Sequence, residues 1–256
     1  MTAQTERAHT WRRQAHAALV IVQKNALLYY LKPPVLIFGV LLPVFFFLAF
    51  KMGRRIAAED AVPGMVAMAL WFTASAIGPL VTPWERRAKT YERLIATPVS
   101  LRAILAGDVV SGLMFGVCLS LVPVVLGLAL TDASIARPAV LVAGIALGAL
   151  SFASLGSLLA APPASSPSNI MLLSNLVRLP LLFVSGVFIP IAQMPGWARW
   201  IALVSPLSYA GDLIRSGFGQ PAYFPSWLSV VMLATFTVAL FWGACRFHRR
   251  WRAKGL

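Results

Sequence analysis

The sequence predicts an all-α membrane protein with six transmembrane helices, an amphipathic interfacial helix before the first span and a re-entrant helical element before the last. Two observations predict this class. Hydrophobic residues make up 59% of the 256 residues and charged residues only 12%, about half the charged share of a soluble domain. The mean hydropathy is +0.79. This composition excludes a disordered chain, because disorder requires low hydrophobicity and high charge.

Six apolar runs are the candidate spans. The first run is followed by Gly53, Arg54 and Arg55 rather than by a small-residue cleavage site, so we interpret it as a retained span and not as a signal peptide. It is shorter than the other five, which approach or exceed the roughly 20 residues that cross a hydrocarbon core. The runs are 35–50, 61–84, 104–130, 139–161, 169–190 and 227–247.

Basic residues predict the orientation of the chain. An even number of spans places both termini on one side, and most lysines and arginines fall on that side, within residues 7–32, 86–102 and 246–254. Cytoplasmic loops carry this excess, so we expect a multi-pass protein of the cell inner (plasma) membrane with both termini in the cytoplasm. Lys51, Arg54 and Arg55 oppose this assignment. The same bias explains the net charge of +14, so we expect the lipid bilayer and no nucleic acid as a partner.

The sequence contains no recognisable catalytic, metal or cofactor site. Cys118 and Cys245 stand alone in apolar runs, and the histidines lie near the ends of the chain, so neither a zinc site nor a disulfide framework is predicted. A Walker A phosphate loop is also absent. We therefore expect one transmembrane domain over residues 1–256 that is not an enzyme and binds no cofactor itself.

Residues 10–30 have the pattern of an amphipathic helix. Apolar side chains recur at helical spacing at Leu19, Val22, Ala26 and Tyr30, and basic residues share the segment. Such a helix is suited to the membrane interface. The alternative is a soluble helix that docks on a partner.

Residues 85–100 carry many charges of both signs and predict a short cytoplasmic helix. Tyr91, Leu94 and Ile95 follow the i, i+3, i+4 spacing of one helix face. A solvated loop that only carries positive charge needs neither an apolar stripe nor acidic residues. A helix with both is suited to a groove on a cytoplasmic protein.

The stretch before the last run is apolar but broken by prolines. Pro190, Pro195 and Pro206 make one continuous helix costly. Broken helices at membrane depth must be buried in protein or line a wet cavity. We therefore expect a re-entrant element on the extracellular side over residues 191–212, with aromatic residues at the interface.

Two further features have alternative interpretations. Gly112 with Gly116, and Gly144 with Gly148, have the spacing that lets helices approach closely, either within the bundle or at a dimer contact. Arg178 lies inside the fifth run, where it either faces an interior cavity or extends to the interface. Asp108 is its possible partner.

The charged segment resembles the cytoplasmic element of type-2 ABC transporter permeases, the exporter class that includes drug, polysaccharide and nodulation-factor systems. The usual pattern there is Glu-Arg-Glu-x-Gly-Thr-Leu-Glu-Arg-Leu followed by Thr-Pro. Arg87, Lys89 and Tyr91 depart from it. The matching residues are Glu85, Arg86, Thr90, Glu92, Arg93, Leu94, Thr97 and Pro98.

A second similarity to the same family precedes the last run. Residues 185–190, 194–195 and 205–209 are similar to the series Ser-Gly-x-Phe-x-Pro, Met-Pro and Asn-Pro-Leu-Thr-Tyr. Ser205 and Ser208 stand where the family has Asn and Thr. Both similarities occur in the family's order and on the predicted sides of the membrane.

The resemblance implies the transmembrane permease subunit of an ATP-driven exporter. It implies a nucleotide-binding ATPase subunit that holds ATP and Mg, and a second permease copy, identical or related. The residues expected to couple to the ATPase are Glu85, Arg86, Arg87, Thr90, Tyr91, Glu92, Arg93, Leu94 and Pro98. Those expected at the translocation path or gate are Arg178, Pro190, Pro206 and Tyr209.

The substrate class is only weakly indicated. Short outer loops and an apolar bundle slightly favour a lipophilic drug, a lipid or a lipid-linked glycan. The alternative function is an ATP-independent channel or an intramembrane enzyme. A channel would require rings of polar residues along its spans, and an enzyme would require clustered ionisable groups.

Overall fold

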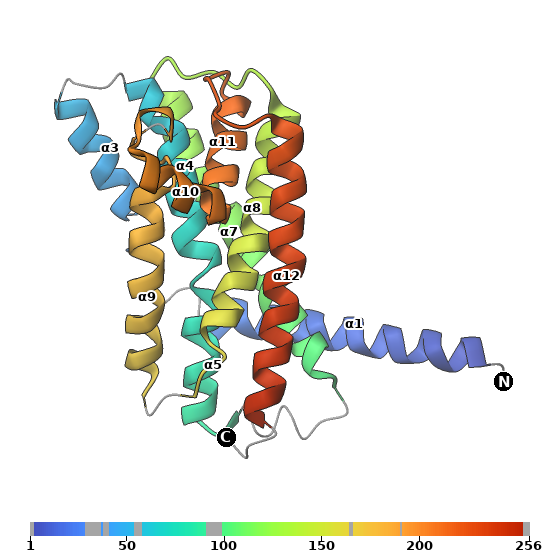
Figure 1. Cartoon of the computed structure of the whole chain (residues 1–256). Coiled ribbons are helices and arrows are strands. Elements are labelled where there is room, and N and C mark those ends of the chain that lie inside the picture. The colour runs from blue at the N-terminus through green and yellow to red at the C-terminus, as the bar shows by residue number, and fades with distance from the viewer. Residues whose placement is uncertain are drawn as a thin grey trace.

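The computed structural model describes residues 3–28, 37, 41–53, 58–90, 99–163, 166–189 and 191–252. The elements found in these residues are helices, and the long ones run side by side in a bundle (Figure 1). They are α1 (Ala3–Leu28), α3 (Leu42–Gly53), α4 (Ala58–Ala74), α5 (Ile77–Arg87), α7 (Leu101–Leu130), α8 (Pro138–Leu159), α9 (Pro167–Val184), the 3₁₀ turn η2 (Ile191–Gln193), α10 (Gly196–Val204), α11 (Pro206–Gly217) and α12 (Ser226–Arg252).

Five helical segments among the described residues are long and apolar enough to cross a membrane. They are Glu59–Arg87, Leu101–Leu130, Pro138–Leu159, Pro167–Val184 and Ser226–Trp251. The all-helical class and five of the six expected spans are thus found. The first expected span, 35–50, lies partly outside the described residues. Its described residues are 37 and 41–50, of which 42–50 belong to α3. The 12 residues of α3 extend only about 18 Å, so the sixth span stays a prediction.

Local residues explain where several helices begin. The Ser100 hydroxyl accepts a hydrogen bond from the Ala103 N–H at 3.2 Å, which caps α7. Pro138, Pro167 and Pro206 are the first residues of α8, α9 and α11. Proline is favoured there because its missing N–H would have no partner in the first helical turn.

The second span is broken in the middle, which the sequence reading of one run over 61–84 did not include. α4 ends at Ala74 and α5 begins at Ile77. The Ala76 N–H bonds to the Thr73 carbonyl at 3.3 Å, in a tighter turn than an α-helix makes. Pro79 explains the position of the break, since a proline inside a helix removes one hydrogen bond and clashes with the carbonyl four residues earlier, here that of Ser75.

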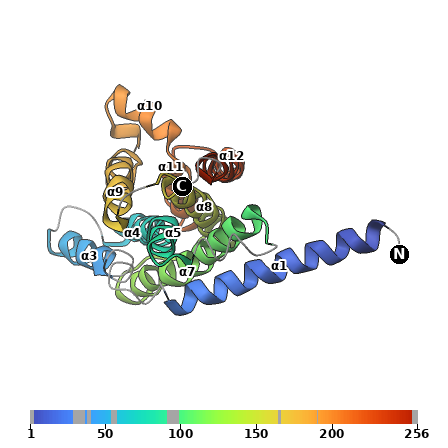
Figure 2. The ribbon, with the colours of Figure 1, turned by 90° about the horizontal axis from the view of Figure 1, so that it is seen from below.

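The broken span forms the centre of the bundle. Seen along the bundle, α4 and α5 lie between α3, α7, α8 and α9 (Figure 2). Trp71 and Phe72 of α4 are almost completely buried, and Trp71 packs edge-on against Phe152 of α8 with ring centroids 4.8 Å apart. α8 in turn packs against α7, α11 and α12. The core therefore surrounds the break.

The paired glycines mark close helix crossings inside the bundle. A Cβ at Gly112 would lie 2.6 Å from the Ala153 Cβ, and one at Gly144 would lie 2.8 Å from the Leu213 Cβ. Gly116 and Gly148 are similarly close to neighbouring helices of the same chain. Packing within the bundle is thus confirmed, and these glycine faces are already occupied.

α1 lies across the end of the bundle that carries the C-terminus, and its N-terminal part extends away from it (Figures 1 and 2). A helix is present over most of the expected range 10–30 and ends at Leu28, with Tyr30 outside the described residues, and its place at the membrane interface stays a prediction. Burial in the bundle does not follow the expected apolar stripe. Leu19 is 63% exposed, whereas Val22 and the neighbouring Ile21 are buried. Ile21 packs at Gly107 of α7, so contact with α7 determines which side of α1 is buried.

Candidate functional site

Glu85 lies in the last turn of α5 and is only 5% exposed. It forms an ion pair with Lys24 of α1. The helix expected over 85–100 does not begin at Glu85, because α5 continues from the membrane span to Arg87. Lys89 follows with a left-handed φ of 55°, a conformation that ends a helix. Glu85 therefore has a partner inside this chain.

Arg86 also has partners within the chain. Its guanidinium donates to the Pro162 carbonyl at 3.1 Å and to the Ala161 carbonyl at 3.4 Å, just after α8. Thr90 donates its hydroxyl to the Glu85 carbonyl at 3.2 Å. Arg87 and Thr90 are exposed. The remaining expected coupling residues, Tyr91, Glu92, Arg93, Leu94 and Pro98, lie outside the described residues.

A second polar contact joins α1 to α7. The Asn25 amide donates to Asp108 Oδ1 at 2.8 Å and to Ser111 Oγ at 3.1 Å, and all three side chains are buried. Sequence reasoning missed Lys24 and Asn25. The available signal was Asp108, because a carboxylate inside an apolar run requires a polar partner.

A third contact fixes α1 to the start of α7. The Gln14 side-chain oxygen accepts hydrogen bonds from the backbone N–H and the hydroxyl of Ser100, both at 3.0 Å. Together with the Lys24–Glu85 and Asn25–Asp108 contacts, it joins α1 both to α5, which precedes residues 88–100, and to α7, which follows them. A displacement of that segment would therefore act on α1, α5 and α7 together.

Arg178 is buried beside the break in the central span. It is 5% exposed, its guanidinium donates to the Phe72 carbonyl at 2.7 Å, and its charge lies 4.9 Å from the centre of the Phe72 ring. The Trp71 indole donates in turn to the Arg178 carbonyl at 3.3 Å. The expected pairing with Asp108 is wrong, since Asp108 binds Asn25 on the α1 side of α7. The interior position is thus favoured over extension to the interface.

The short elements η2, α10 and α11 lie between α9 and α12, at the end of the bundle opposite the C-terminus (Figure 1). Pro206 starts α11, and nearly all of that helix is buried. The Tyr209 hydroxyl donates to the Leu203 carbonyl at 2.8 Å, and its ring stacks on Phe224 at 4.7 Å. Pro190, the fourth expected gate residue, lies outside the described residues.

Two charged residues of α11, Asp212 and Arg215, bond to the segments on either side of the outer element. They were not predicted from the sequence. Asp212 accepts hydrogen bonds from the Tyr223 and Phe224 N–H groups at 2.9 and 2.7 Å, just before α12. Arg215 donates to the carbonyls of Gly186 and Val187, just after α9. The signal was available, because charged residues inside an apolar segment are costly unless they have partners.

The buried polar contacts described above connect helices to one another. Among the described residues, no three His, Cys, Asp or Glu side chains gather in a way that could hold a metal ion. The polar groups brought together instead join helices. They lie at one end of the bundle, at the central break and at the opposite end.

Comparison with known proteins indicates the family. Residues 16–219 match the model of the family described as ABC-2 type transporter. Nodulation protein J of Sinorhizobium fredii is 29% identical over 184 residues, which cover 66% of this chain and 68% of the relative. Nodulation protein J of Bradyrhizobium diazoefficiens is 28% identical over 194 residues, covering 73% and 71%. The matched family segment includes the second half of α1, the central break, Arg178 and all of α11, and it spans well over half of the sequence, so the chain belongs to the ABC-2 type transporter family.

Proposed function

We propose that this chain is the permease subunit of an ATP-driven exporter. A separate ATPase subunit binds ATP and Mg, and a second permease copy, identical or related, completes the translocation path. The observation that carries the proposal is the family match over residues 16–219. The fastening of α1, α5 and α7 at one end of the bundle supports a mechanical link to such a subunit.

The proposed coupling contact is the segment that follows α5. Arg87, Thr90, Tyr91, Glu92, Arg93, Leu94 and Pro98 bind the ATPase, while Glu85 and Arg86 hold the start of the segment to α1 and to the end of α8. Closure of the ATPase subunits around ATP then displaces α5 and α1 together. ATP can drive this change only because it binds the closed state more tightly than the open one.

The proposed gate combines the central break and the outer element. The break divides the central span into α4 and α5, so the two halves do not form one rigid rod. α5 can therefore tilt while α4 keeps its position. Arg178 keeps a hydrogen bond at the break. On the outer side, Pro206 and Tyr209 position the re-entrant element that closes the path, and Pro190 is assigned to the same gate.

The proposed orientation has both termini in the cytoplasm, and the proposed cargo is a lipophilic drug, a lipid or a lipid-linked glycan. The apolar bundle and the family relationship to proteins named Nodulation protein J favour a cargo with a lipid part. Export through a path between two copies requires no metal or cofactor on this chain.

The test is co-purification with an ABC ATPase subunit from the same organism, followed by ATP-dependent movement of a fluorescent lipid in liposomes. We expect Leu94→Asp to abolish ATPase binding and transport, because a charge replaces an inserted apolar side chain. The matched control is Leu130→Asp at the far end of α7, where Leu130 is 53% exposed; it should retain ATPase binding. Full transport by the chain without any ATPase would refute the proposal and favour a channel.

A further inference from the structure

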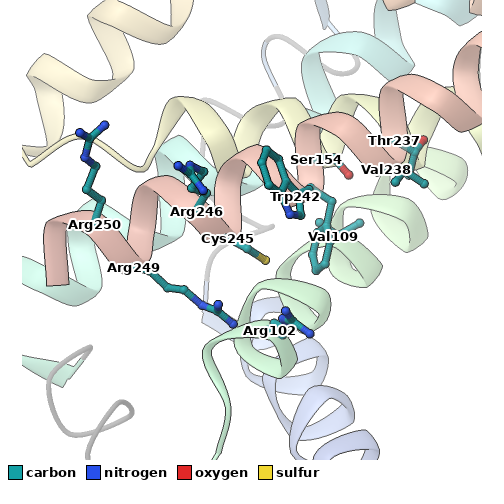
Figure 3. A pocket seen from close by; sticks show the side chains of 11 residues that line it. Arg102, Val109, Ser154, Thr237, Val238, Trp242, Cys245, Arg246, Arg249 and Arg250 are labelled. Carbon is teal, nitrogen blue, oxygen red and sulfur yellow. The ribbon is translucent and has the colours of Figure 1, made fainter. Parts of the chain in front are cut away.

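A groove of about 760 Å³ opens between α7, α8 and α12 near the C-terminal end of the bundle (Figure 3). Its two ends differ in chemistry. Arginines line the end near the C-terminus of α12, and apolar side chains line the part that continues along the span. Neither the coupling contacts nor the gate described above includes this groove.

The basic end is built by two helices that are far apart in sequence. Arg102 lies in the first turn of α7 and Arg249 near the end of α12, and their guanidinium groups point toward each other (Figure 3). Arg246 and Arg250 extend from the same part of α12. Among the residues that the structure describes, the ion pair found is Lys24–Glu85, so no described carboxylate lies within ion-pair distance of these four arginines. Arg246 lies over the Trp242 ring, 5.5 Å from its centre.

The positive end of α7 adds to this charge. Arg102 is the second residue of a 30-residue helix, and the first N–H groups of a helix point toward anions. If these arginines served only the positive-inside bias, they could lie anywhere around this end of the bundle. Here they gather at the mouth of a groove whose other half is apolar.

The apolar half faces outward along α12. Val238 is 70% exposed and Trp242 is 62% exposed, and Phe241 lines the same groove. A second hollow of about 550 Å³ shares Val238 and Trp242 and continues toward Ala234. Exposed apolar side chains on a span of this length are suited to contact with acyl chains.

We propose that this groove binds an anionic phospholipid from the leaflet at the C-terminal end of the bundle. Arg102 and Arg249 hold the headgroup phosphate, because guanidinium groups match phosphate oxygens with paired hydrogen bonds. One acyl chain lies along Trp242 and Val238. A soluble anion would satisfy the arginines but leave the apolar half of the groove unused, so a lipid fits the groove better.

The position of Trp242 in the groove allows a direct test without the ATPase, so its outcome is independent of the proposed transport function. The chain is reconstituted in phosphatidylcholine nanodiscs that contain a small, equal fraction of brominated phosphatidylglycerol or brominated phosphatidylcholine. Bromine quenches tryptophan fluorescence at contact distance. The Trp242 contribution is the difference between the unaltered chain and Trp242→Phe.

We expect brominated phosphatidylglycerol to quench the Trp242 contribution several-fold more than brominated phosphatidylcholine does. The double variant Arg102→Gln/Arg249→Gln should remove this difference. Arg137→Gln, which removes the charge of an exposed arginine at the opposite end of the bundle, should leave it intact. Thermal unfolding of each variant verifies that the fold is retained.

Three results would overturn the proposal. The first is equal quenching by the two lipids in the unaltered chain. The second is loss of the phosphatidylglycerol preference when inorganic phosphate is added at constant ionic strength, which would make the arginines a site for soluble anions. The third is a phosphatidylglycerol preference that persists in the double variant, which would show that residues other than Arg102 and Arg249 hold the headgroup.

Discussion

The contact between α8 and the break of the central span can be tested by adding a single methyl group. A Cβ at Gly156 would lie 2.4 Å from the Ser75 carbonyl oxygen and 2.9 Å from its carbon. Ordinary van der Waals contact begins at 3.4 Å, so Gly156→Ala must push α8 and the break about 1 Å apart. The obstacle is backbone, which cannot rotate away as a flexible side chain does.

The expected magnitude is the balance of two opposing effects. Alanine favours a helix over glycine by about 1 kcal/mol, whereas overpacking costs about 1–3 kcal/mol. Because the break is already held by Arg178, we expect the upper part of that range and a net loss of about 2 kcal/mol in the free energy of unfolding. The same displacement should lower transport, since it alters the break.

Gly211→Ala in α11 is the matched control. A Cβ there has no atom within 4 Å, so only the helix preference remains and the free energy of unfolding should rise by up to about 1 kcal/mol. Unfolding in mixed micelles titrated with sodium dodecyl sulfate measures both variants under identical conditions. The close packing of α8 on the break is refuted if Gly156→Ala is as stable as Gly211→Ala.

Three further predictions concern the buried charges. Lys24→Met should lower the free energy of unfolding by about 1–3 kcal/mol, because Glu85 then stays buried without its ion-pair partner. The double variant Lys24→Met/Glu85→Leu should recover most of that loss in the same titration. A loss in the double variant equal to the sum of the losses in the two single variants would contradict this. Asp212→Ala should lower the unfolding free energy by about 1–3 kcal/mol, because two backbone N–H groups lose their acceptor, and an unchanged value would show that water replaces the carboxylate. Arg178→Leu should lower ATP-driven lipid movement with ATPase binding intact, and unchanged movement would remove Arg178 from the gate.

The long spans could be located from the sequence because each is marked by a continuous run of apolar residues. The run predicted over 104–130 became α7, Leu101–Leu130, and that over 139–161 became α8, Pro138–Leu159. A hydrocarbon core requires a minimum length of apolar residues whatever the neighbours are, so these helices need no knowledge of packing. The first expected span, 35–50, is shorter than the others and only partly described, with α3 (Leu42–Gly53) covering its second half, so it stays a prediction.

The partners of the polar residues could not be obtained in this way. Asp108 was a reasonable partner for Arg178 from sequence, but it bonds to Asn25, 83 positions away. Glu85 pairs with Lys24, 61 positions away, a contact that the sequence did not indicate, and its expected contact with an ATPase stays a prediction. Hydrogen bonds and ion pairs act over a few ångströms, so they depend on how helices cross, and that depends on all the packed side chains together.

The amino-acid sequence alone was enough to assign this chain as a helical membrane protein with family motifs near residue 85 and before the last span. The length of an apolar run, the distribution of basic residues and the positions of prolines are local properties of the sequence. In a membrane these properties directly determine where the chain spans the bilayer and where a helix is interrupted. The folded structure was needed to show that Arg178 forms a hydrogen bond at the break in the central span and that α1 is bonded to α5 and α7. It was also needed to show that Arg102 and Arg249 lie together beside an apolar groove. Each of these joins residues far apart in sequence, and no periodic pattern records which helices become neighbours.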